Sequence, residues 1–229
     1  MTGAKEKLVI VGDGETAELA YSYFKADPRY EVVGFATEAA HKKNQVLFGL
    51  PVVDFETIQE QFNPKSHLAF VAISCTNLNR LRRRLFEQTK KKGYRLTSYI
   101  SPHAVIGEDV SVGENCFILE NTVIQRGVEI GDDITIWSGS SVGHRSKLRS
   151  HCFLAIHVAV SGFCYIGKGA LLGVNSCTVG NVKVGDDCIV GAGAVVTKDT
   201  AFGRVYVGNP AQPLPDRTTD VYISGAKKI

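Results

Sequence analysis

The sequence lacks the features that mark membrane, secreted and zinc-binding proteins. No stretch approaches the ~20 consecutive apolar residues of a membrane span. The opening "MTGAKEKLVIVGDG" has no apolar segment before a cleavage site, so we expect no signal peptide and a cytoplasmic location. None of the six cysteines stands in a C-x-x-C pair, so we expect reduced thiols and no zinc. A net charge of +3 gives no overall argument for a nucleic-acid partner. What is present is a chain of 229 residues, 44% of them apolar, long enough for one large or two small domains.

The sequence has a strong internal period of six. From Ile100 onward every sixth residue is aliphatic, with Thr178 as the one exception and no insertion that breaks the step. These positions are Ile100, Ile106, Val112, Ile118, Ile124, Ile130, Ile136, Val142, Leu148, Leu154, Val160, Ile166, Leu172, Thr178, Val184, Val190 and Val196. Four residues after each lies a small or β-branched residue, a slot that holds Cys116, Cys152, Cys164 and Cys188. We therefore expect these thiols to be compact core residues and not reactive groups.

A period of six fits neither an α-helix nor a simple β alternation. It fits a short strand and a turn repeated as a parallel β-helix, in which stacked coils bury a continuous aliphatic column. Glycine often follows the aliphatic position, as in "IGEDVS", "VGENCF" and "IGDDIT", and supplies the turns together with Asp and Asn. The pattern predicts a β-helix over residues 99–205, followed by a C-terminal segment at 206–229.

Residues 1–98 have a different pattern. The strand "KLVIVG", the helix "DGETAELAYSYFKAD" and the strand "YEVVGFA" form a βαβ unit. "LAFVAIS" (68–74) is a further buried strand, and a helix is predicted over residues 77–93, closed by Gly93. We expect a small Rossmann-like α/β domain. The basic residues between Arg80 and Lys92 lie on this one helix without interleaved aromatics, so a solvated helix face is favoured over a nucleic-acid site.

"GDGETA" (12–17) matches G-x-G-x-x-A at the first strand-to-helix turn, the place where such loops hold phosphate. The second strand is followed by Thr37 and Glu38, and Glu38 is a candidate for binding a ribose. The domain is small for a complete dinucleotide fold, so a nucleotide-linked ligand is favoured over nicotinamide chemistry. The alternative is a tight turn that only packs the helix on the sheet.

Together the two halves resemble the NeuD/PglD-type sugar acyltransferases. The matching stretches are "IVGDGETAE", "VAISCTNLNRLR", "GYRLTSYISPHAVIGEDVSVGENCFILENTVIQ", "IWSGSSVGHRS", "HCFLAIHVAVSG", "GVNSCT", "VGAGAVV" and "VYVGNPAQ". The resemblance implies a left-handed β-helix with roughly 18 residues per coil and a homotrimer with active sites between subunits. It implies an acetyl-CoA-dependent N-acetyltransferase that acts on a nucleotide-linked amino sugar and needs no metal. The alternative is O-acetylation of a sialic acid or another sugar.

The resemblance also implies roles for individual residues. His144 in "VGHRS" falls at the family's general base, and His157 in "LAIHVAVSG" is the second catalytic candidate. The acetyl-CoA positions are Phe153, Gly162, Gly173, Val174, Asn175, Ala192 and Lys198. The positions on the nucleotide-sugar side are Gly14, Glu15, Thr16, Thr37 and Glu38, with Asn79 and Arg82 as further candidates. "YVGNPAQP" (206–213) resembles the segment that closes over the adenine end.

The chain departs from the family pattern beside the candidate base. Many members carry Asp or Glu immediately after this histidine, and here the residue is Arg145. A neighbouring cation does not stabilise imidazolium. Either another carboxylate stabilises the imidazolium, or His144 acts as a base with less stabilisation, or its role has shifted.

Other interpretations of residues 139–157 stay open or are disfavoured. His144, His151 and His157 lie in successive hexads, hence on different faces of the predicted tube, so one chain cannot gather them on one ion. A zinc lyase assembled across a trimer stays open, as does a non-catalytic nucleotide-binding trimer, and His151 is expected to be a surface turn residue. "GSSVG" (139–143) matches G-x-S-x-G, but no helix follows Ser141, which a nucleophile elbow requires.

Overall fold

The computed structural model describes residues 4–223, which divide into two units. The first, called the α/β unit, contains the chain up to Ser74 and Leu81–Ser98. The second, called the tube, contains Cys75–Arg80 and the chain from Tyr99 onward. The short segment Cys75–Arg80 therefore belongs structurally to the tube, although it interrupts the α/β unit in sequence.

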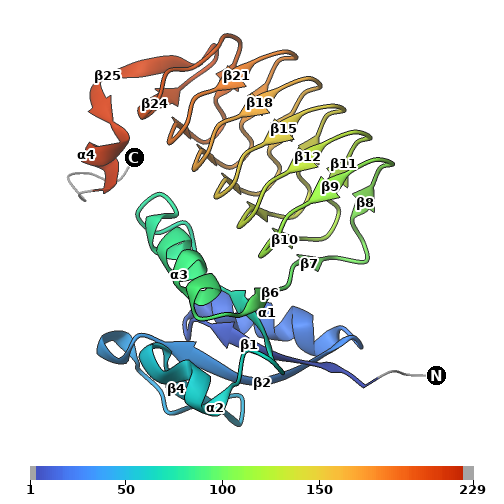
Figure 1. Cartoon of the computed structure of the whole chain (residues 1–229). Helices are drawn as coiled ribbons and strands as arrows, with labels where there is room; N and C mark the ends of the chain where they lie inside the picture. The colour runs from blue at the N-terminus through green and yellow to red at the C-terminus, as the bar shows by residue number, and fades with distance from the viewer. Residues whose placement is uncertain (1–3, 224–229) are drawn as a thin grey trace. The chain divides into compact units, whose positions relative to one another are not determined.

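The α/β unit is built on a six-stranded sheet with the order β3-β4-β2-β1-β5-β6, parallel except for the β3–β4 pair. Residues Leu8–Val11 of β1 are fully buried, as expected for a parallel strand covered on both faces (Figure 1). Its elements are β1 (Glu6–Val11), α1 (Glu15–Ala26), β2 (Tyr30–Thr37), η1 (Ala39–His41), β3 (Val46–Leu47), β4 (Leu50–Asp54), η2 (Phe55–Thr57), α2 (Ile58–Gln61), β5 (Leu68–Val71), α3 (Arg80–Lys91) and β6 (Arg95–Leu96).

The basic helix starts later than expected, and one of its basic residues, Arg82, is not solvated. The predicted helix over 77–93 starts only at Arg80, because Asn77, Leu78 and Asn79 all take left-handed φ angles of 51° to 61° that a right-handed helix cannot contain. The helix is also not simply a solvated face. Arg82 is buried, with 1% of its surface exposed, and Arg84 is held by an ion pair described below.

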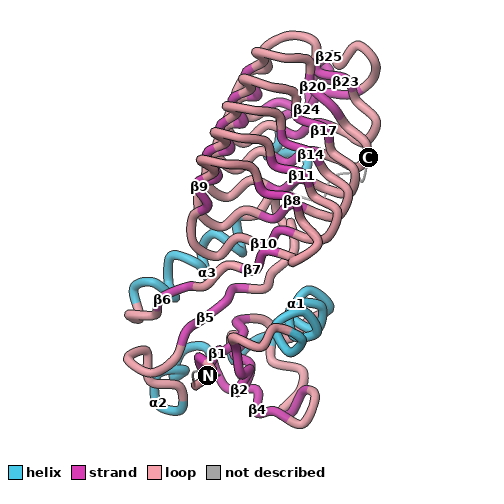
Figure 2. The backbone as a smooth tube through the Cα atoms, turned by 90° about the vertical axis from the view of Figure 1, so that its right-hand side faces the viewer, coloured by secondary structure: helices cyan, strands magenta, loops and turns pink. Residues whose placement is uncertain are grey.

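The tube is a parallel β-helix of triangular coils. Phe117 pairs with Thr135 and Thr135 with Phe153, so each coil has 18 residues, in agreement with the sequence period. Figure 2 shows the strands of each face stacked along the tube. The strands are β7 (Tyr99–Ile100), β8 (Val105–Ile106), β9 (Ser111–Val112), β10 (Phe117–Ile118), β11 (Val123–Ile124), β12 (Glu129–Ile130), β13 (Thr135–Ile136), β14 (Ser141–Val142), β15 (Lys147–Leu148), β16 (Phe153–Leu154), β17 (Ala159–Val160), β18 (Tyr165–Ile166), β19 (Leu171–Leu172), β20 (Cys177–Thr178), β21 (Lys183–Val184), β22 (Ile189–Val190) and β23 (Val195–Val196). β24 (Arg204–Val207) continues the β22 sheet, and β25 (Gln212–Thr218) and α4 (Thr219–Ile223) follow.

The core of the tube confirms the predicted aliphatic column. Every sixth-residue position from Ile118 to Val196 is buried, and Ile106, in the first coil, is 37% exposed. The small slot is buried as well, including its four cysteines. Burial raises the pKa of the Cys152 thiol to about 12 and that of Cys188 to about 11, so these thiols stay protonated and unreactive at neutral pH.

The turns of the tube follow the same step of six. Fifteen successive turn residues take left-handed φ angles, from Asp109 to Gly193. Within the described residues all but four of them are Asn, Asp or Gly, which adopt this conformation at low cost. The four exceptions are consecutive: Arg145, His151, His157 and Phe163. Strained backbone is therefore concentrated in one short part of the tube.

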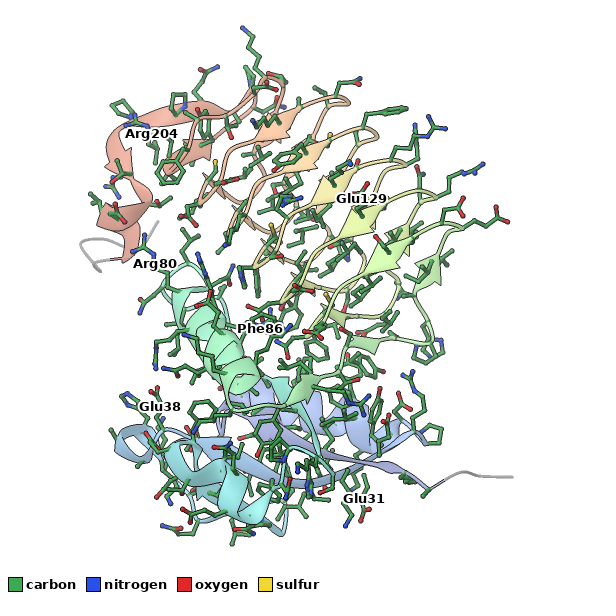
Figure 3. The ribbon with its side chains drawn as sticks, viewed as in Figure 1. Glu31, Glu38, Arg80, Phe86, Glu129 and Arg204 are labelled. Atoms are coloured by element: carbon green, nitrogen blue, oxygen red, sulfur yellow. The ribbon has the colours of Figure 1, made fainter. Side chains whose placement is uncertain are left out.

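The three faces of the tube differ in chemistry. The β9 face (β9, β12, β15, β18, β21) carries polar and charged outer residues such as Lys147 and Glu129, and Figure 3 shows Glu129 on the outside of the rungs. The β7 face carries bulky apolar residues, and Leu78 packs there on Ile189 and Val205. The outer positions of the β8 face (β8, β11, β14, β17, β20, β23) carry small or apolar residues without charge: Val105, Val123, Ser141, Ala159, Cys177 and Val195.

Candidate active site

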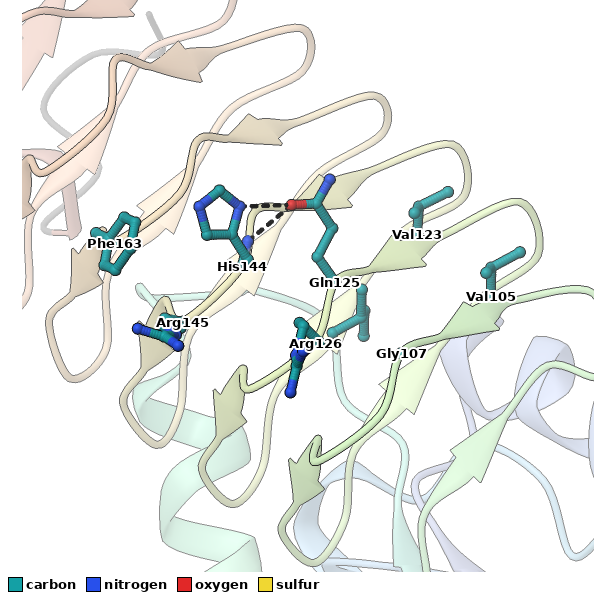
Figure 4. Close-up of a pocket in the computed structure, with 9 residues that line it drawn as sticks. Val105, Gly107, Val123, Gln125, Arg126, His144, Arg145 and Phe163 are labelled. Atoms are coloured by element: carbon teal, nitrogen blue, oxygen red, sulfur yellow. Dashed lines mark hydrogen bonds between the residues drawn. The ribbon is translucent and has the colours of Figure 1, made fainter.

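His144 lies on the edge where the β8 and β9 faces meet, called the β8/β9 edge. It follows β14 and is exposed. Beside it the tube has a hollow of about 540 Å³, within the range of small-molecule sites. The lining residues are Val105, Gly107, Val123, Ile124, Gln125, Arg126, His144, Arg145 and Phe163 (Figure 4). Apolar side chains and a few polar groups thus converge on one imidazole.

The imidazole of His144 is fixed from below by Gln125, one coil earlier. The Gln125 Oε1 atom lies 3.0 Å from His144 Nδ1 and also accepts the backbone N–H of His144 at 2.9 Å (Figure 4). The Phe163 ring stands edge-on to the imidazole at 4.9 Å, and the Arg145 guanidinium lies 5.9 Å from the Phe163 ring centre. Two side chains and one backbone bond therefore set the ring orientation.

Gly162 leaves room for this ring in the next coil. A Cβ atom at Gly162 would lie 2.7 Å from His144 Cε1 and 2.9 Å from Nε2, closer than carbon atoms pack. The imidazole ring consequently lies against bare backbone, with Cε1 nearest. Only glycine at this position allows the observed ring position.

The other candidates of the tube lie on a different edge. His157, Gly173, Val174, Asn175 and Ala192 occupy the turns between the β7 and β8 faces, called the β7/β8 edge. As predicted, Asn175 stacks one coil above His157, and its N–H donates to the carbonyl of Ile156 at 3.0 Å. Within one chain the whole β8 face separates this edge from His144. Lys198 is exposed, and its place on the β8/β9 edge is three coils beyond His144.

The candidates of the α/β unit gather at the carboxyl ends of its parallel strands. Gly12 has a φ of 131°, and a Cβ there would lie 2.7 Å from the Ala72 carbonyl, so the turn after β1 needs glycine. Gly14 caps α1 and leaves the amides of Glu15 and Thr16 facing this edge without a covering side chain. The strand order reverses between β1 and β5, the place where open α/β sheets bind ligands.

Glu38 already forms an ion pair with Arg84, a residue of the helix face that was expected to be solvated. Both of its carboxylate oxygens accept from the Arg84 guanidinium, at 2.7 Å and 2.8 Å. The hydrogen bonds from Arg84 hold the pKa of Glu38 below its ordinary value. Thr37, the last residue of β2, is 9% exposed. Any ligand hydroxyl that donates a hydrogen bond to Glu38 must share that carboxylate with Arg84.

Comparisons with known proteins agree with this geometry. The model "Bacterial transferase hexapeptide (six repeats)" matches residues 109–144, and "Hexapeptide repeat of succinyl-transferase" matches residues 165–198. A UDP-3-O-acylglucosamine N-acyltransferase of Campylobacter lari is 27% identical over 52% of this chain and 37% of its own. A serine acetyltransferase of Mycobacterium tuberculosis is 34% identical over 49% of this chain and 43% of its own. The chain thus spans less than half the length of these two relatives.

Solved structures match almost the whole chain. A perosamine N-acetyltransferase variant from Caulobacter crescentus, in complex with CoA and GDP-perosamine, has a TM-score of 0.83 and 29% identity, covering 93% of this chain and 99% of that one. The acetyltransferase domain of PglB from Neisseria gonorrhoeae has a TM-score of 0.80 and 25% identity, covering 92% and 100%. The family-model matches and these solved structures support the NeuD/PglD-type sugar acyltransferase family for this chain. The predicted fold, a Rossmann-like α/β domain followed by a left-handed parallel β-helix, is confirmed.

Within this NeuD/PglD-type fold, His151 corrects a prediction. It is not a surface residue but is 6% exposed, and its Nδ1 lies 2.8 Å from Asp133 Oδ2. Asp133 also accepts from Asn115 at 2.8 Å, and the His151 carbonyl accepts from Asn79 at 2.9 Å. His151 and Asn79 therefore tie the Cys75–Arg80 segment to the coils, so His151 has a structural role.

Two other observations bear on the remaining predictions. Phe153 lies on the β7 face, 8% exposed and 6.4 Å from the Trp137 ring, and thus on neither candidate edge.

In residues 4–223 no helix is long and apolar enough to cross a membrane. Over the same residues, no three His, Cys, Asp or Glu side chains are grouped as metal ligands are. The three histidines of residues 144–157 follow β14, β15 and β16, which belong to three different faces, as predicted.

Proposed function

We propose that the protein is a CoA-dependent N-acetyltransferase that acts on a nucleotide-linked amino sugar, with His144 as the general base. The observation that carries the proposal is the imidazole of His144, which lines a hollow on the edge of a hexapeptide β-helix and packs against the bare backbone of Gly162. The 29% identity with a perosamine N-acetyltransferase over almost the whole chain supports the same chemistry.

The reaction needs few groups. The neutral amine of the sugar attacks the thioester carbonyl, a C–N bond forms, and His144 Nε2 takes the amine proton. The oxyanion accepts from a backbone N–H of a turn beside the hollow. The C–S bond then breaks, and the CoA thiolate leaves and takes up the proton from imidazolium. The products are an acetamido sugar and free CoA, with no covalent enzyme intermediate.

The cofactor residues support a site between two chains. Gly162 and Lys198 lie on the β8/β9 edge, and Lys198 is three coils from His144, about 14 Å at the spacing of neighbouring strands. That length suits an extended pantetheine arm that reaches a CoA phosphate at Lys198. His157, Val174, Asn175 and Ala192 lie on the other edge of the β8 face. A neighbouring copy that packs on this face would bring its β7/β8 edge to the His144 edge.

The β8 face itself supports a homotrimer. Its outer row is uncharged and includes the exposed Val105, 61% accessible, and Val123, whereas the β9 face carries lysines and glutamate. We expect Ala159→Glu, in the middle of the β8 face, to dissociate the assembly, and Lys183→Glu on the β9 face to leave it intact. Sedimentation equilibrium measures the mass. A wild-type mass of one 24.8 kDa chain would contradict the proposal.

The α/β unit is proposed to hold the nucleotide. Its diphosphate fits the amides of Glu15 and Thr16 at the start of α1, where the helix dipole favours anions. Thr37 and Glu38, at the end of β2, are placed for the ribose or base. Because acetyl-CoA and nucleotide sugars are cytoplasmic metabolites, the proposal carries a cytoplasmic location with it.

The decisive experiment measures thiol release from acetyl-CoA over a panel of UDP-, GDP- and dTDP-linked amino sugars. We expect one acceptor to be turned over and His144→Ala to lower kcat by about 10²-fold or more, the usual worth of general-base help. Activity retained in His144→Ala would move the base to His157 or to a base-free mechanism. No thiol release with any acceptor would leave a nucleotide-binding trimer.

One observation favours a second candidate, O-acetylation of an acidic sugar of the sialic-acid type. Two guanidinium groups, Arg126 and Arg145, line the His144 hollow, whose lining residues include no carboxylate. Such a site disfavours an ammonium acceptor and favours a hydroxyl on a sugar that carries an anionic group. Hydroxyl acceptors with and without a carboxylate therefore belong in the same thiol-release panel.

A further inference from the structure

We propose that Gln125 is a positioning residue, whose side-chain carbonyl holds His144 in the Nδ1–H tautomer and leaves Nε2 free as the base. It takes the place of the carboxylate that many family members carry after the histidine and that Arg145 replaces here. The proposal rests on the proposed function for its kinetic consequence, but the tautomer itself can be measured without turnover.

The hydrogen bonds identify both atoms of the contact. The Gln125 atom that faces His144 accepts the backbone N–H of His144 at 2.9 Å, and only the amide oxygen can accept. The same oxygen lies 3.0 Å from Nδ1. Because a carbonyl oxygen cannot donate, Nδ1 must carry the hydrogen. In a neutral imidazole Nε2 then has the lone pair.

The geometry of the coils explains why this residue is a glutamine. Residue 125 lies one coil below residue 143, at the turn position that Gly107 and Gly143 occupy in the neighbouring coils. A Cβ at Gly143 would lie 2.4 Å from the Gly162 nitrogen, a clash with backbone, so residue 143 must be glycine and has no side chain to support the ring. The long side chain of Gln125 rises instead from the coil below, past the bare Gly143.

A neutral partner also fits the charges at this edge. The charged groups that line the hollow are Arg126 and Arg145. Arg126 also forms an ion pair with Asp109, in which Nη2 lies 3.4 Å from Oδ2. Among the lining residues no carboxylate faces the imidazole. Gln125 therefore orients His144 without placing a negative charge beside the ring.

The first experiment determines the tautomer of His144 by ¹⁵N NMR of protein labelled at histidine, with His144→Gln used to assign the signal. We expect the neutral ring to carry its hydrogen on Nδ1 in the wild type and to become a mixture of tautomers in Gln125→Leu. A wild-type ring with its hydrogen on Nε2, or a tautomer unchanged by Gln125→Leu, would overturn the inference.

The second experiment measures kcat and KM as a function of pH. Gln125→Leu should lower kcat by about 10- to 100-fold, as expected for a lost hydrogen bond to a group that becomes charged, with KM for acetyl-CoA unchanged. Gln125→Glu keeps an acceptor and should restore most of kcat, while its negative charge moves the acid limb of the profile up by about one pH unit. An unshifted profile in Gln125→Glu would count against the contact. If no acceptor is turned over, the proposed function fails and the NMR result still decides the role of Gln125.

Discussion

Replacing Arg145 by asparagine should make the protein more stable and less active. Arg145 has a φ of 54°, a left-handed conformation that costs an ordinary L-residue about 1–2 kcal/mol and asparagine much less. The replacement also loses the contact of the guanidinium with the Phe163 ring at 5.9 Å, which is worth about 0.5–1 kcal/mol at an exposed site. The net gain is about 0.5–1 kcal/mol, or about 1–4 °C in Tm for a chain of this size.

Thermal unfolding at a fixed protomer concentration measures the effect, because the Tm of an oligomer depends on concentration. The matched control makes the opposite change at another left-handed turn. Asn121, with a φ of 57°, is exposed, and Asn121→Arg should lower Tm by a similar amount. If Arg145→Asn leaves Tm unchanged or lowers it while Asn121→Arg has no effect, the turn conformation carries no cost of this size and the reasoning fails.

The same substitution tests why the chain tolerates the strain. Arg145 lines the His144 hollow, so its loss should reduce kcat/KM even though the protein becomes more stable. That combination is the signature of a residue kept for function at the expense of the fold. Unchanged kcat/KM with a raised Tm would show that Arg145 has no part in the site.

Three further predictions address separate contacts. Gly162→Ala should lower kcat by about 10-fold or more, because its Cβ displaces the His144 ring, whereas Gly180→Ala, one coil further, has room for the methyl group and should retain activity. Glu38→Gln should cost less than about 1 kcal/mol at pH 7, since the pair with Arg84 is partly exposed. Because the folded-state pKa of Glu38 is lowered, the difference between Glu38→Gln and the wild type should shrink as pH falls from about 4.5 and disappear in acid, as urea titrations measure. Four cysteines should resist a thiol reagent at pH 8 in the folded protein and react after unfolding: Cys116, Cys152, Cys164 and Cys188.

The tube could be predicted from the sequence because its rule is local and repeated. Each hexad places one aliphatic residue inward, and an error in any single hexad is corrected by its neighbours. The burial of His151 could not be predicted because it depends in part on Asn79, which lies outside the repeat. Asn79 belongs to a segment that reads as the start of a helix and is in fact three left-handed residues. No hexad rule contains that information.

The support of the candidate base was missed for a different reason. Along the chain the residue after His144 is Arg145 and not a carboxylate, and the partner is Gln125, one coil below. The signal was present, since a coil of 18 residues places residue 125 directly under residue 143. Contacts between coils of this β-helix join residues about 18 apart in sequence, and Gln125 reaches His144 at i + 19.

Two of the three histidines in residues 144–157, His151 and His157, have a common physical origin. In those coils the turn position that elsewhere holds Asn, Asp or Gly holds Arg145, His151, His157 and Phe163 instead. Histidine tolerates the left-handed conformation better than most side chains, so it is a low-cost way to place a functional group there. Arg145 and Phe163 are not low-cost, and both line the His144 hollow. His151 has a structural role, and His157 lies on the edge that a second chain would bring to His144. The strain therefore marks the coils where the tube stops being a uniform scaffold and carries a site.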